Sequence, residues 1–281
     1  MIPVGWRRRR WYRRQHGRRF RPRAVETFSD KVNWRILYDR RPLLEGTCDK
    51  LWMKEHAARV ASDLVRVPET LWSGTDLVGL SGVALPERWV LKPNHSTKRV
   101  ILGEGPPDVE ALLRQTAGWL EENLSSPTGE WASRHARPVF LVEEFIGRPG
   151  EVPADFKVYV FDGVPRLIQV HSDRFVEHHS RVYSTTWEAL PWSTGHPSGP
   201  EVERPRRLRE MLSAAALLAQ DFDMLRVDFY EQDDVLWFGE LTPYPGSGLV
   251  TLDPEMERQL GQWWRLPSRS RVRRFPWSDL T

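Results

Sequence analysis

The sequence predicts a mixed α/β (α+β) protein, and three observations support this fold class. The chain has 281 residues, 40% of them hydrophobic, which is enough to bury one large core or two smaller lobes. Some segments show apolar residues at helical spacing. Other segments are short, rich in β-branched and aromatic residues, and bounded by turn residues, as is typical of strands.

Helices are predicted in three parts of the chain. Residues 29–56 have helical apolar spacing, which Arg40-Arg41-Pro42 interrupts, and a second helix is expected to begin near Asp49. Residues 108–124 form the next predicted helix, ended by a Ser-Ser-Pro-Thr-Gly run. Residues 205–220 form the last, with a proline near its start.

Strands are predicted between these helices and after them. The predicted strands are 89–92, 138–145, 156–162, 166–170, 225–230 and 235–241. Asp162-Gly163 is typical of a tight hairpin turn, and the acidic turn 231–234 closes a second hairpin. Residues 177–203 lack regular periodicity, so a long loop is expected there.

Composition excludes several classes of protein. The single cysteine, Cys48, rules out an internal disulfide and a cysteine zinc site, and it fits a reducing compartment. No apolar run approaches the roughly 18 residues that span a bilayer. No apolar stretch follows the first arginines as in a signal peptide. We therefore expect a cytoplasmic protein without a transmembrane segment.

Positive charge is concentrated at the start of the chain. Ten arginines lie between Arg7 and Arg23 with no acidic residue among them, although the formal net charge is only +3. Such a run could hold an anionic polymer or an anionic membrane surface. The run is also compatible with a helix whose cationic face is simply solvated.

The hairpin formed by 225–230 and 235–241 carries the clearest chemical pattern. With a strand period of two, its first strand presents Arg226, Asp228 and Tyr230 on one face. On the second strand Leu236, Phe238 and Glu240 are expected to share a face, which Thr242 continues. Asp228 and Glu240 could then meet across neighbouring strands. Two close carboxylates favour a bound cation such as Mg²⁺, or else a salt bridge with Arg226.

Two lysines could complement these carboxylates. Lys92 ends an apolar strand, and Lys157 lies within the apolar run that begins at Asp155. An unpaired ammonium group would be costly there, so each lysine is expected to have an anionic partner. Nucleotide phosphates are suitable partners, and two lysines with two carboxylates could bind magnesium-ATP. Each lysine alone could also be an edge-strand charge.

Motifs along most of the chain resemble the ATP-grasp enzymes, in particular the branch named for teichuronopeptide biosynthesis (TupA-like). The first motifs are Thr27-Phe-Ser-Asp-Lys-Val-Asn-Trp, Cys48-Asp-Lys and Trp89-Val-Leu-Lys-Pro-Asn-His-Ser. The later ones are Val142-Glu-Glu-Phe-Ile, Asp155-Phe-Lys-Val-Tyr-Val-Phe-Asp-Gly, Arg226-Val-Asp-Phe-Tyr, Phe238-Gly-Glu-Leu-Thr and the Pro-Gly-Ser-Gly-Leu that begins at Pro245. Their order along the chain makes the resemblance specific.

The resemblance implies a role for individual residues. Lys92 and Lys157 would hold ATP phosphates, Glu143 and Glu144 would lie at the adenine-binding hinge, and Ser96 and Thr97 would also contact the nucleotide. Asp228 and Glu240 would bind magnesium, with Thr242 where many relatives have an asparagine ligand. Arg226, and Lys157 again, would stabilise charge during catalysis.

The same resemblance implies the domain organisation. An N-terminal helical, acceptor-side region with the arginine-rich arm would cover 1–80, a small ATP-grasp lobe 81–143, a large lobe with the metal site 144–270, and a tail 271–281. ATP would lie between antiparallel sheets of the two lobes. The chain departs from its relatives after Lys92, where His95-Ser-Thr-Lys replaces a usual His-Gly-Ser-Gly.

The function that this resemblance implies is ATP-dependent joining of a carboxylate to an amine through an acyl phosphate, with ADP and phosphate released. The carboxylate would belong to a small molecule or a glycan, and the amine to a substrate such as an amino acid. The pathway would be cell-surface polysaccharide or peptide-conjugate synthesis, or secondary metabolism. Two alternatives remain open. One is a degenerate ATP-grasp module that binds an anionic polymer, and the other is an ATP-grasp-type kinase.

Overall fold

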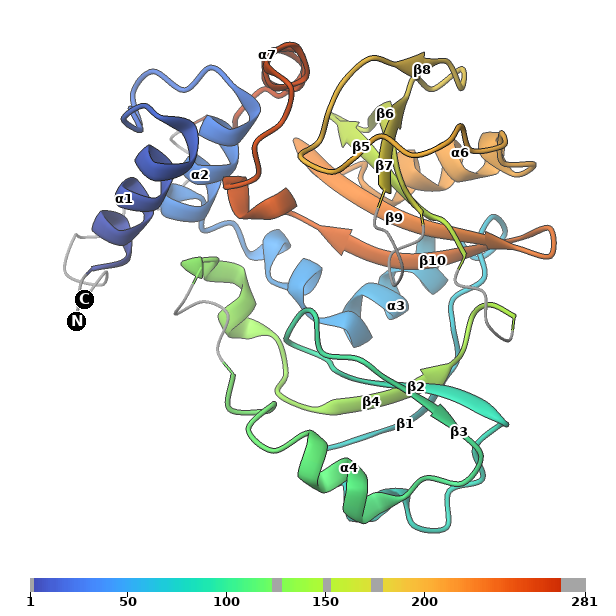
Figure 1. Cartoon of the computed structure of the whole chain (residues 1–281). Coiled ribbons are helices and arrows are strands. Elements are labelled where there is room, and N and C mark those ends of the chain that lie inside the picture. Colours follow the sequence, from blue (N-terminus) through green and yellow to red (C-terminus); the bar gives the residue numbers. More distant parts are fainter. Residues whose placement is uncertain (1–2, 123–127, 149–152, 173–178, 269–281) are drawn as a thin grey trace.

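A computed structural model describes residues 3–122, 128–148, 153–172 and 179–268, and these residues form two antiparallel sheets surrounded by helices (Figure 1). The described part also contains five short 3-10 helices. They are η1 (Pro42–Leu44), η2 (Gly46–Cys48), η3 (Leu77–Leu80), η4 (Trp131–His135) and η5 (Pro245–Gly248). No helix within the described ranges is both long enough and apolar enough to span a bilayer.

The larger sheet has six strands in the order β10-β9-β5-β6-β7-β8. Its strands are β5 (Asp155–Phe161), β6 (Val164–Ser172), β7 (His179–Tyr183), β8 (Ala189–Leu190), β9 (Met224–Gln232) and β10 (Val235–Thr242). Helix α6 (Leu208–Leu218) packs against β5, β6 and β9. It buries Met211, Ala215 and Leu218, which share one face at helical spacing.

The smaller sheet has four strands in the order β1-β4-β2-β3. Its strands are β1 (Thr70–Gly74), β2 (Arg88–Pro93), β3 (Ile101–Glu104) and β4 (Phe140–Glu144). Alternate residues of β2 are buried, and Trp89 and Leu91 join a separate core with Leu112 of α4 (Val109–Gln115). Each sheet thus has its own hydrophobic core.

Helix α3 (Lys50–Val60) contacts both sheets. Asp49 caps it by accepting a hydrogen bond from the Trp52 amide at 2.9 Å. Met53 Sδ accepts a hydrogen bond from the Leu241 amide of β10, while Lys54 pairs with Glu143 of β4. The helix therefore ties the smaller sheet to the larger one (Figure 1).

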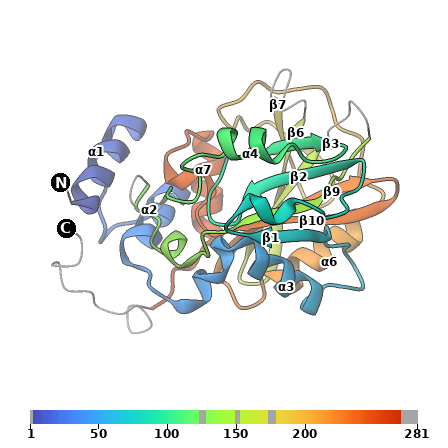
Figure 2. The ribbon, with the colours of Figure 1, turned by 90° about the horizontal axis from the view of Figure 1, so that it is seen from below.

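Three helices lie at one end of the molecule: α1 (Val4–His16), α2 (Phe28–Tyr38) and α7 (Pro254–Trp263) (Figure 2). A capping box starts α2, in which Thr27 and Asp30 each accept a hydrogen bond from the other's backbone amide. Tyr12 of α1 and Trp34 of α2 share a small third core.

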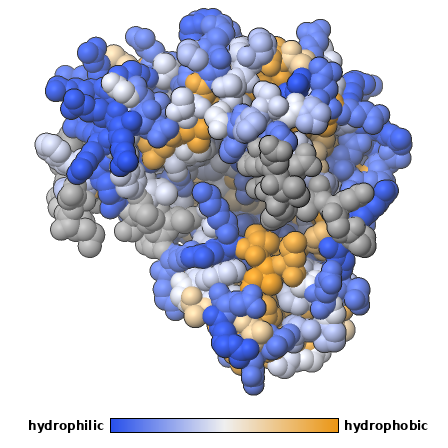
Figure 3. Space-filling model, viewed as in Figure 1, coloured by the Kyte–Doolittle hydropathy of each residue, from blue (hydrophilic) through white to orange (hydrophobic). Residues whose placement is uncertain are grey.

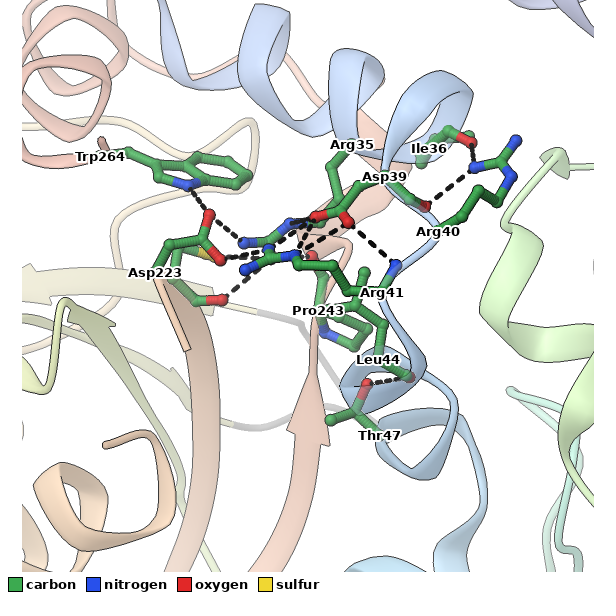
Figure 4. A network of polar contacts seen from close by, with 11 residues as sticks. Arg35, Ile36, Asp39, Arg40, Arg41, Leu44, Thr47, Asp223, Pro243 and Trp264 are labelled. Carbon is green, nitrogen blue, oxygen red and sulfur yellow. Dashed lines mark hydrogen bonds and ion pairs between the residues drawn. The ribbon is translucent and has the colours of Figure 1, made fainter. Parts of the chain in front are cut away.

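A buried ion-pair network joins α2 to the larger sheet (Figure 4). Asp223, just before β9, accepts hydrogen bonds from Arg35 at 2.7 Å, Arg41 at 2.6 Å and the Trp264 indole at 2.6 Å. Asp39 pairs with Arg41 at 2.6 Å. Burial opposes ionisation of Asp223, but Arg35 and Arg41 hold its pKa below the ordinary value.

Two predicted elements were wrong in extent. The helix expected over 108–124 ends at Gln115 within the described residues, because a left-handed backbone at Gly118 (φ 79°) breaks it. The loop expected over 177–203 contains β7 and β8, while residues 177 and 178 lie outside the described part. Pairing with β6 makes β7 a strand although its sequence, His-Ser-Arg-Val-Tyr, has little apolar periodicity.

The domain limits drawn from the sequence remain a proposal. The four-stranded sheet includes β1, which precedes residue 81, and β4 ends at Glu144. The proposed tail 271–281 lies outside the described residues.

Candidate functional site

Strands β9 and β10 bring the two predicted metal ligands opposite each other. Glu240 pairs with Asp228, and Thr242 pairs with Arg226. Asp228 is buried, and the Glu240 side chain is 41% exposed. The predicted meeting of the two carboxylates is therefore present in the strand register.

A β-bulge between Phe238 and Glu240 decides which side chains face this site. Phe238 and Leu241 both lie in the large core, so Glu240 lies on the opposite face. The expectation that Leu236, Phe238 and Glu240 share a face was wrong, because the bulge at Gly239 reverses the alternation. A Cβ atom at Gly239 would lie 2.8 Å from the Asp228 carbonyl oxygen, so the close approach requires glycine.

Two cations hold Asp228 in its charged form. Arg226 donates from Nε and Nη2 at 2.7 Å each, and Lys157 donates to Oδ2 at 2.6 Å. Lys157 also pairs with Asp155 at 2.6 Å. Burial alone would raise the pKa of Asp228, but the charges of Arg226 and Lys157 hold it well below its usual range.

Arg226 also joins the second carboxylate to the group. Its Nη2 lies 3.2 Å from Glu240 Oε1 and 3.1 Å from Thr242 Oγ1, and that hydroxyl donates to Glu240 at 3.2 Å. The salt bridge expected as the alternative to a metal is thus present. A metal ion bound by Asp228 and Glu240 would therefore share these two carboxylates with the Arg226 guanidinium.

The smaller sheet contributes a second charged group. Lys92 of β2 donates a hydrogen bond to Glu143 of β4, and Lys54 of α3 donates to the other Glu143 oxygen at 3.1 Å. Burial opposes ionisation of Glu143, yet the charges of Lys92 and then Lys54 lower its pKa. One carboxylate therefore faces two ammonium groups, which leaves positive charge in excess.

Lys50 lies between the two groups. Its ammonium donates to the backbone oxygens of Pro93 at 3.1 Å, Asn94 at 3.2 Å and Ser96 at 2.6 Å. Burial, followed by the charge of Lys92, lowers the Lys50 pKa to about 8, while Glu240 and Glu143 oppose that shift. The Lys50 pKa therefore depends on charges from both sheets, namely Glu240 of the larger sheet and Lys92 and Glu143 of the smaller sheet.

The non-glycine loop after Lys92 is held by side chains. Asn94 accepts a hydrogen bond from the Leu51 amide at 2.8 Å and donates to the Arg137 carbonyl at 2.9 Å. Together with Lys50, these bonds attach the loop to the first turn of α3. The loop therefore has a defined shape although residues 93–98 contain no glycine.

The remaining predicted nucleotide contacts are not all brought together. Ser96 is buried, and its hydroxyl has no hydrogen-bond partner among the described residues, whereas Thr97 is exposed. Glu144 does not share the environment of Glu143. It pairs with Arg66 at 3.0 Å and accepts a hydrogen bond from the Glu69 amide at 2.7 Å.

Sequence reasoning missed Lys50, Lys54 and Asp155 as members of this charged region. Lys50 and Lys54 are four residues apart, so they lie on one face of α3. The Cys48-Asp-Lys motif could have drawn attention to Lys50, but only the tertiary structure places it beside Lys92. Asp155 could have been found as the residue two before Lys157 on the same strand face.

Two sheets, a bridging helix and charged side chains from all three define an ATP-grasp fold, and comparison with known proteins agrees. The model of the family described as TupA-like ATPgrasp matches residues 30–265, most of the chain, so the protein belongs to that family. No sequence among curated proteins matches this chain.

Solved structures with similar folds include ligases. The D-alanine–D-alanine ligase of Bacillus anthracis, complexed with ATP, is 15% identical with a TM-score of 0.44, covering 80% of this chain and 69% of that one. The corresponding enzyme of Helicobacter pylori is 14% identical with a TM-score of 0.46, covering 85% and 69%. The L-amino acid ligase of Bacillus licheniformis is 15% identical with a TM-score of 0.49, covering 73% of this chain and 45% of that one.

Proposed function

We propose that this protein is an ATP-dependent carboxylate–amine ligase of the acid–amino-acid type. The observation that supports it is the convergence of charge from both sheets and from helix α3. Cations come from β2 (Lys92), β5 (Lys157), β9 (Arg226) and α3 (Lys50 and Lys54), beside the acidic pair of the β9–β10 hairpin. Excess positive charge next to paired carboxylates is the complement of magnesium-ATP.

The donor set fits a magnesium ion. Asp228, Glu240 and the Thr242 hydroxyl would hold it with oxygen atoms, and one or two carboxylates plus nucleotide phosphates are usual for this cation. Within the described ranges, no group of three or more acidic, histidine or cysteine side chains could bind a metal by itself. A site that needs nucleotide oxygens is consistent with that finding. The ion would neutralise negative charge on the nucleotide phosphates.

The proposed reaction has two steps. First, a substrate carboxylate oxygen attacks the γ-phosphorus of ATP, so an acyl phosphate forms and ADP leaves. Then the amine attacks the acyl carbon, the amide bond forms, phosphate leaves and the nitrogen loses a proton. Lys92 and Lys157 would bind phosphate oxygens, and Arg226 would stabilise negative charge on the acyl phosphate.

The other assignments are part of the same proposal. Glu143 and Glu144 would lie at the adenine side, and Ser96, whose buried hydroxyl has no partner among the described residues, would contact the nucleotide together with Thr97. The chain would divide into the acceptor-side region 1–80, a small lobe 81–143 and a large lobe 144–270. The pathway would be cell-surface polysaccharide or peptide-conjugate synthesis, or secondary metabolism, in the cytoplasm.

The test is ADP release from magnesium-ATP with a panel of amino acids and sugar acids. We expect release that depends on both a carboxylate and an amine, with an amide product in mass spectrometry. Glu240→Gln should reduce turnover at least about a hundredfold, because one charged oxygen ligand is lost. Asp228→Ala should abolish turnover.

Asp234→Asn is the matched control, because Asp234 belongs to the turn of the same hairpin and pairs at the surface with Arg206. It should leave turnover unchanged. Full activity of Glu240→Gln would refute the metal assignment. A stable phosphorylated product without an amide would identify a kinase instead, and absence of ATP binding would favour the degenerate binding module.

A further inference from the structure

One arginine of helix α1 lies inside the protein. The buried residues of α1 are Arg8 and Tyr12, and Arg8 is 1% exposed. The outer surface over α1 is strongly hydrophilic, as the blue colour at the upper left of Figure 3 shows, which is usual for arginines that stay in water. An arginine is seldom fully buried unless partners offset its charge. The contacts of Arg8 therefore distinguish it from the rest of the arginine-rich run.

The Arg8 guanidinium joins three segments that are far apart in the chain. It donates hydrogen bonds to Asn33 of α2, to the Ser247 carbonyl of η5 and to the Thr128 carbonyl at 3.0 Å. Glu130, close to this group, accepts a hydrogen bond from the Ser247 hydroxyl. Burial lowers the Arg8 pKa and raises the Glu130 pKa, and each of the two charges opposes the other's shift. Arg8 and Glu130 therefore offset each other's charge while both contact Ser247.

The backbone of η5 has a conformation that depends on such contacts. Gly246, Ser247 and Gly248 have φ angles of 55°, 53° and 59°, all in the left-handed region. Glycine adopts this conformation readily, but serine does so only at an energetic cost. Asn33 of α2 donates to the Gly248 carbonyl at 2.7 Å, and His16 Nε2 of α1 lies 3.1 Å from the same oxygen. Side chains of α1 and α2 therefore hold a turn that is strained at its serine.

This turn follows directly from the proposed metal ligands. Strand β10 ends at Thr242, whose hydroxyl donates to Glu240 at 3.2 Å. Two residues later the Tyr244 carbonyl accepts a hydrogen bond from the Ser247 amide at 2.8 Å, and the Tyr244 side chain packs in the large core. Pro243 is the one residue between Thr242 and Tyr244. A shift of Ser247 would therefore reach the end of β10 through a short and buried segment.

We propose that Arg8 is a positioning residue for the magnesium site: by holding η5 it fixes the end of β10, where Thr242 and Glu240 lie. The inference rests on the proposed function, in which these two residues bind a metal ion together with the nucleotide. Contacts behind metal ligands orient them, and their loss typically weakens metal binding about 10–100-fold. The family match begins at residue 30, so α1 adds this contact from outside the matched part of the chain.

Hydrogen exchange of the full chain without nucleotide tests whether Arg8 holds η5. In Arg8→Met we expect the amides of residues 242–249 to exchange at least about tenfold faster than in the original protein. Tyr12→Phe is the matched control, because Tyr12 lies one turn away on the same buried face of α1 and donates to Asp30 of α2 instead of η5. It should leave exchange in this segment unchanged. Equal exchange in Arg8→Met and the original protein would overturn the inference.

Metal affinity tests the consequence, with Mn²⁺ and ADP as the probes. Electron paramagnetic resonance of free Mn²⁺ gives the metal affinity of the protein–ADP complex without turnover. Arg8→Met should weaken this affinity about tenfold, while ADP affinity without metal stays unchanged because the lysine contacts to phosphate are intact. Arg8→Lys keeps the charge and some of the hydrogen bonds, so it should restore part of the Mn²⁺ affinity. Tyr12→Phe should bind Mn²⁺ like the original protein.

Two further results would overturn the inference. Equal loss of Mn²⁺ affinity in Tyr12→Phe and Arg8→Met would show only a general loosening of α1. Unchanged Mn²⁺ affinity in Arg8→Met would show that the contact with η5 does not affect the metal ligands. Absence of Mn²⁺–ADP binding in the original protein would instead refute the proposed function, and hydrogen exchange would then decide by itself whether Arg8 holds η5.

Discussion

Lys50 shows how a single buried charge can make nucleotide binding depend on pH. Its ammonium is held by three backbone carbonyls and lies near Lys92, and its pKa is lowered to about 8 by burial and by that neighbouring charge. Since the folded-state pKa is depressed, the proton that Lys50 carries at neutral pH is lost as pH rises through about 8. Positive charge beside the proposed phosphate site then decreases.

We therefore expect the ATP Kd to rise by up to about tenfold between pH 7 and pH 9, because about a tenth of the free protein keeps a charged Lys50 at pH 9. Lys50→Arg should flatten this dependence, because guanidinium does not titrate in that range. Titration calorimetry at several pH values measures it. Lys54→Arg is the control that keeps the slope, and an unchanged slope in Lys50→Arg would contradict the assignment.

At the scale of elements, the bulge of β10 determines the geometry of the acidic pair. Gly239 allows the strand to pass close to the Asp228 carbonyl, and Glu240 then changes face. Without the bulge, Glu240 would lie on the core side with Phe238. A local backbone feature thus decides whether two carboxylates meet.

Gly239→Ala should destabilise the protein by about 1–3 kcal/mol and reduce turnover, because the new methyl group would press on the β9 backbone. Urea unfolding with the ADP assay measures both effects. Gly5→Ala, in α1, is the control, since nothing lies within 4 Å of its Cβ position, and it should leave stability unchanged or slightly increased. Equal stability of the two variants would refute the close-contact argument.

At the scale of the whole molecule, the network around Asp223 connects α2, the start of β9 and the segment after α7 (Figure 4). Arg35 has its side chain fully buried, so its charge depends on these partners. Removing one charged partner leaves the other charged side chains of the network buried and unpaired.

Asp223→Asn should lower the free energy of unfolding by about 3–5 kcal/mol at pH 7. Because the folded-state pKa of Asp223 is depressed, its contribution is complete above the unfolded value of 3.8 and is lost as pH falls through the folded pKa. The difference in free energy of unfolding between Asp223→Asn and the original protein should therefore become smaller at acidic pH. Denaturant titrations at several pH values follow this change.

Glu255→Gln removes one partner of an exposed pair with Arg258 and serves as the control. Its melting temperature should stay that of the original protein. A difference between Asp223→Asn and the original protein that persists unchanged at low pH would show that shape, not charge, explains the loss.

The sequence by itself determined the local features of this protein. Strand alternation placed Asp228 and Arg226 on one face, and turn residues marked both hairpins. The order of motifs identified the TupA-like ATP-grasp family, which the family match confirms. These features follow from residue type and short-range spacing, which a linear chain contains.

Only the tertiary structure decided which charges face each other. The bulge reversed the face of Glu240, and pairing with β6 turned part of a predicted loop into β7. The fold of α3 brought Lys50 beside β2 and Lys54 beside β4. It also docked α1 beside η5. Such contacts join residues far apart in the chain, and their energies depend on burial and distance, which no local pattern of residues contains.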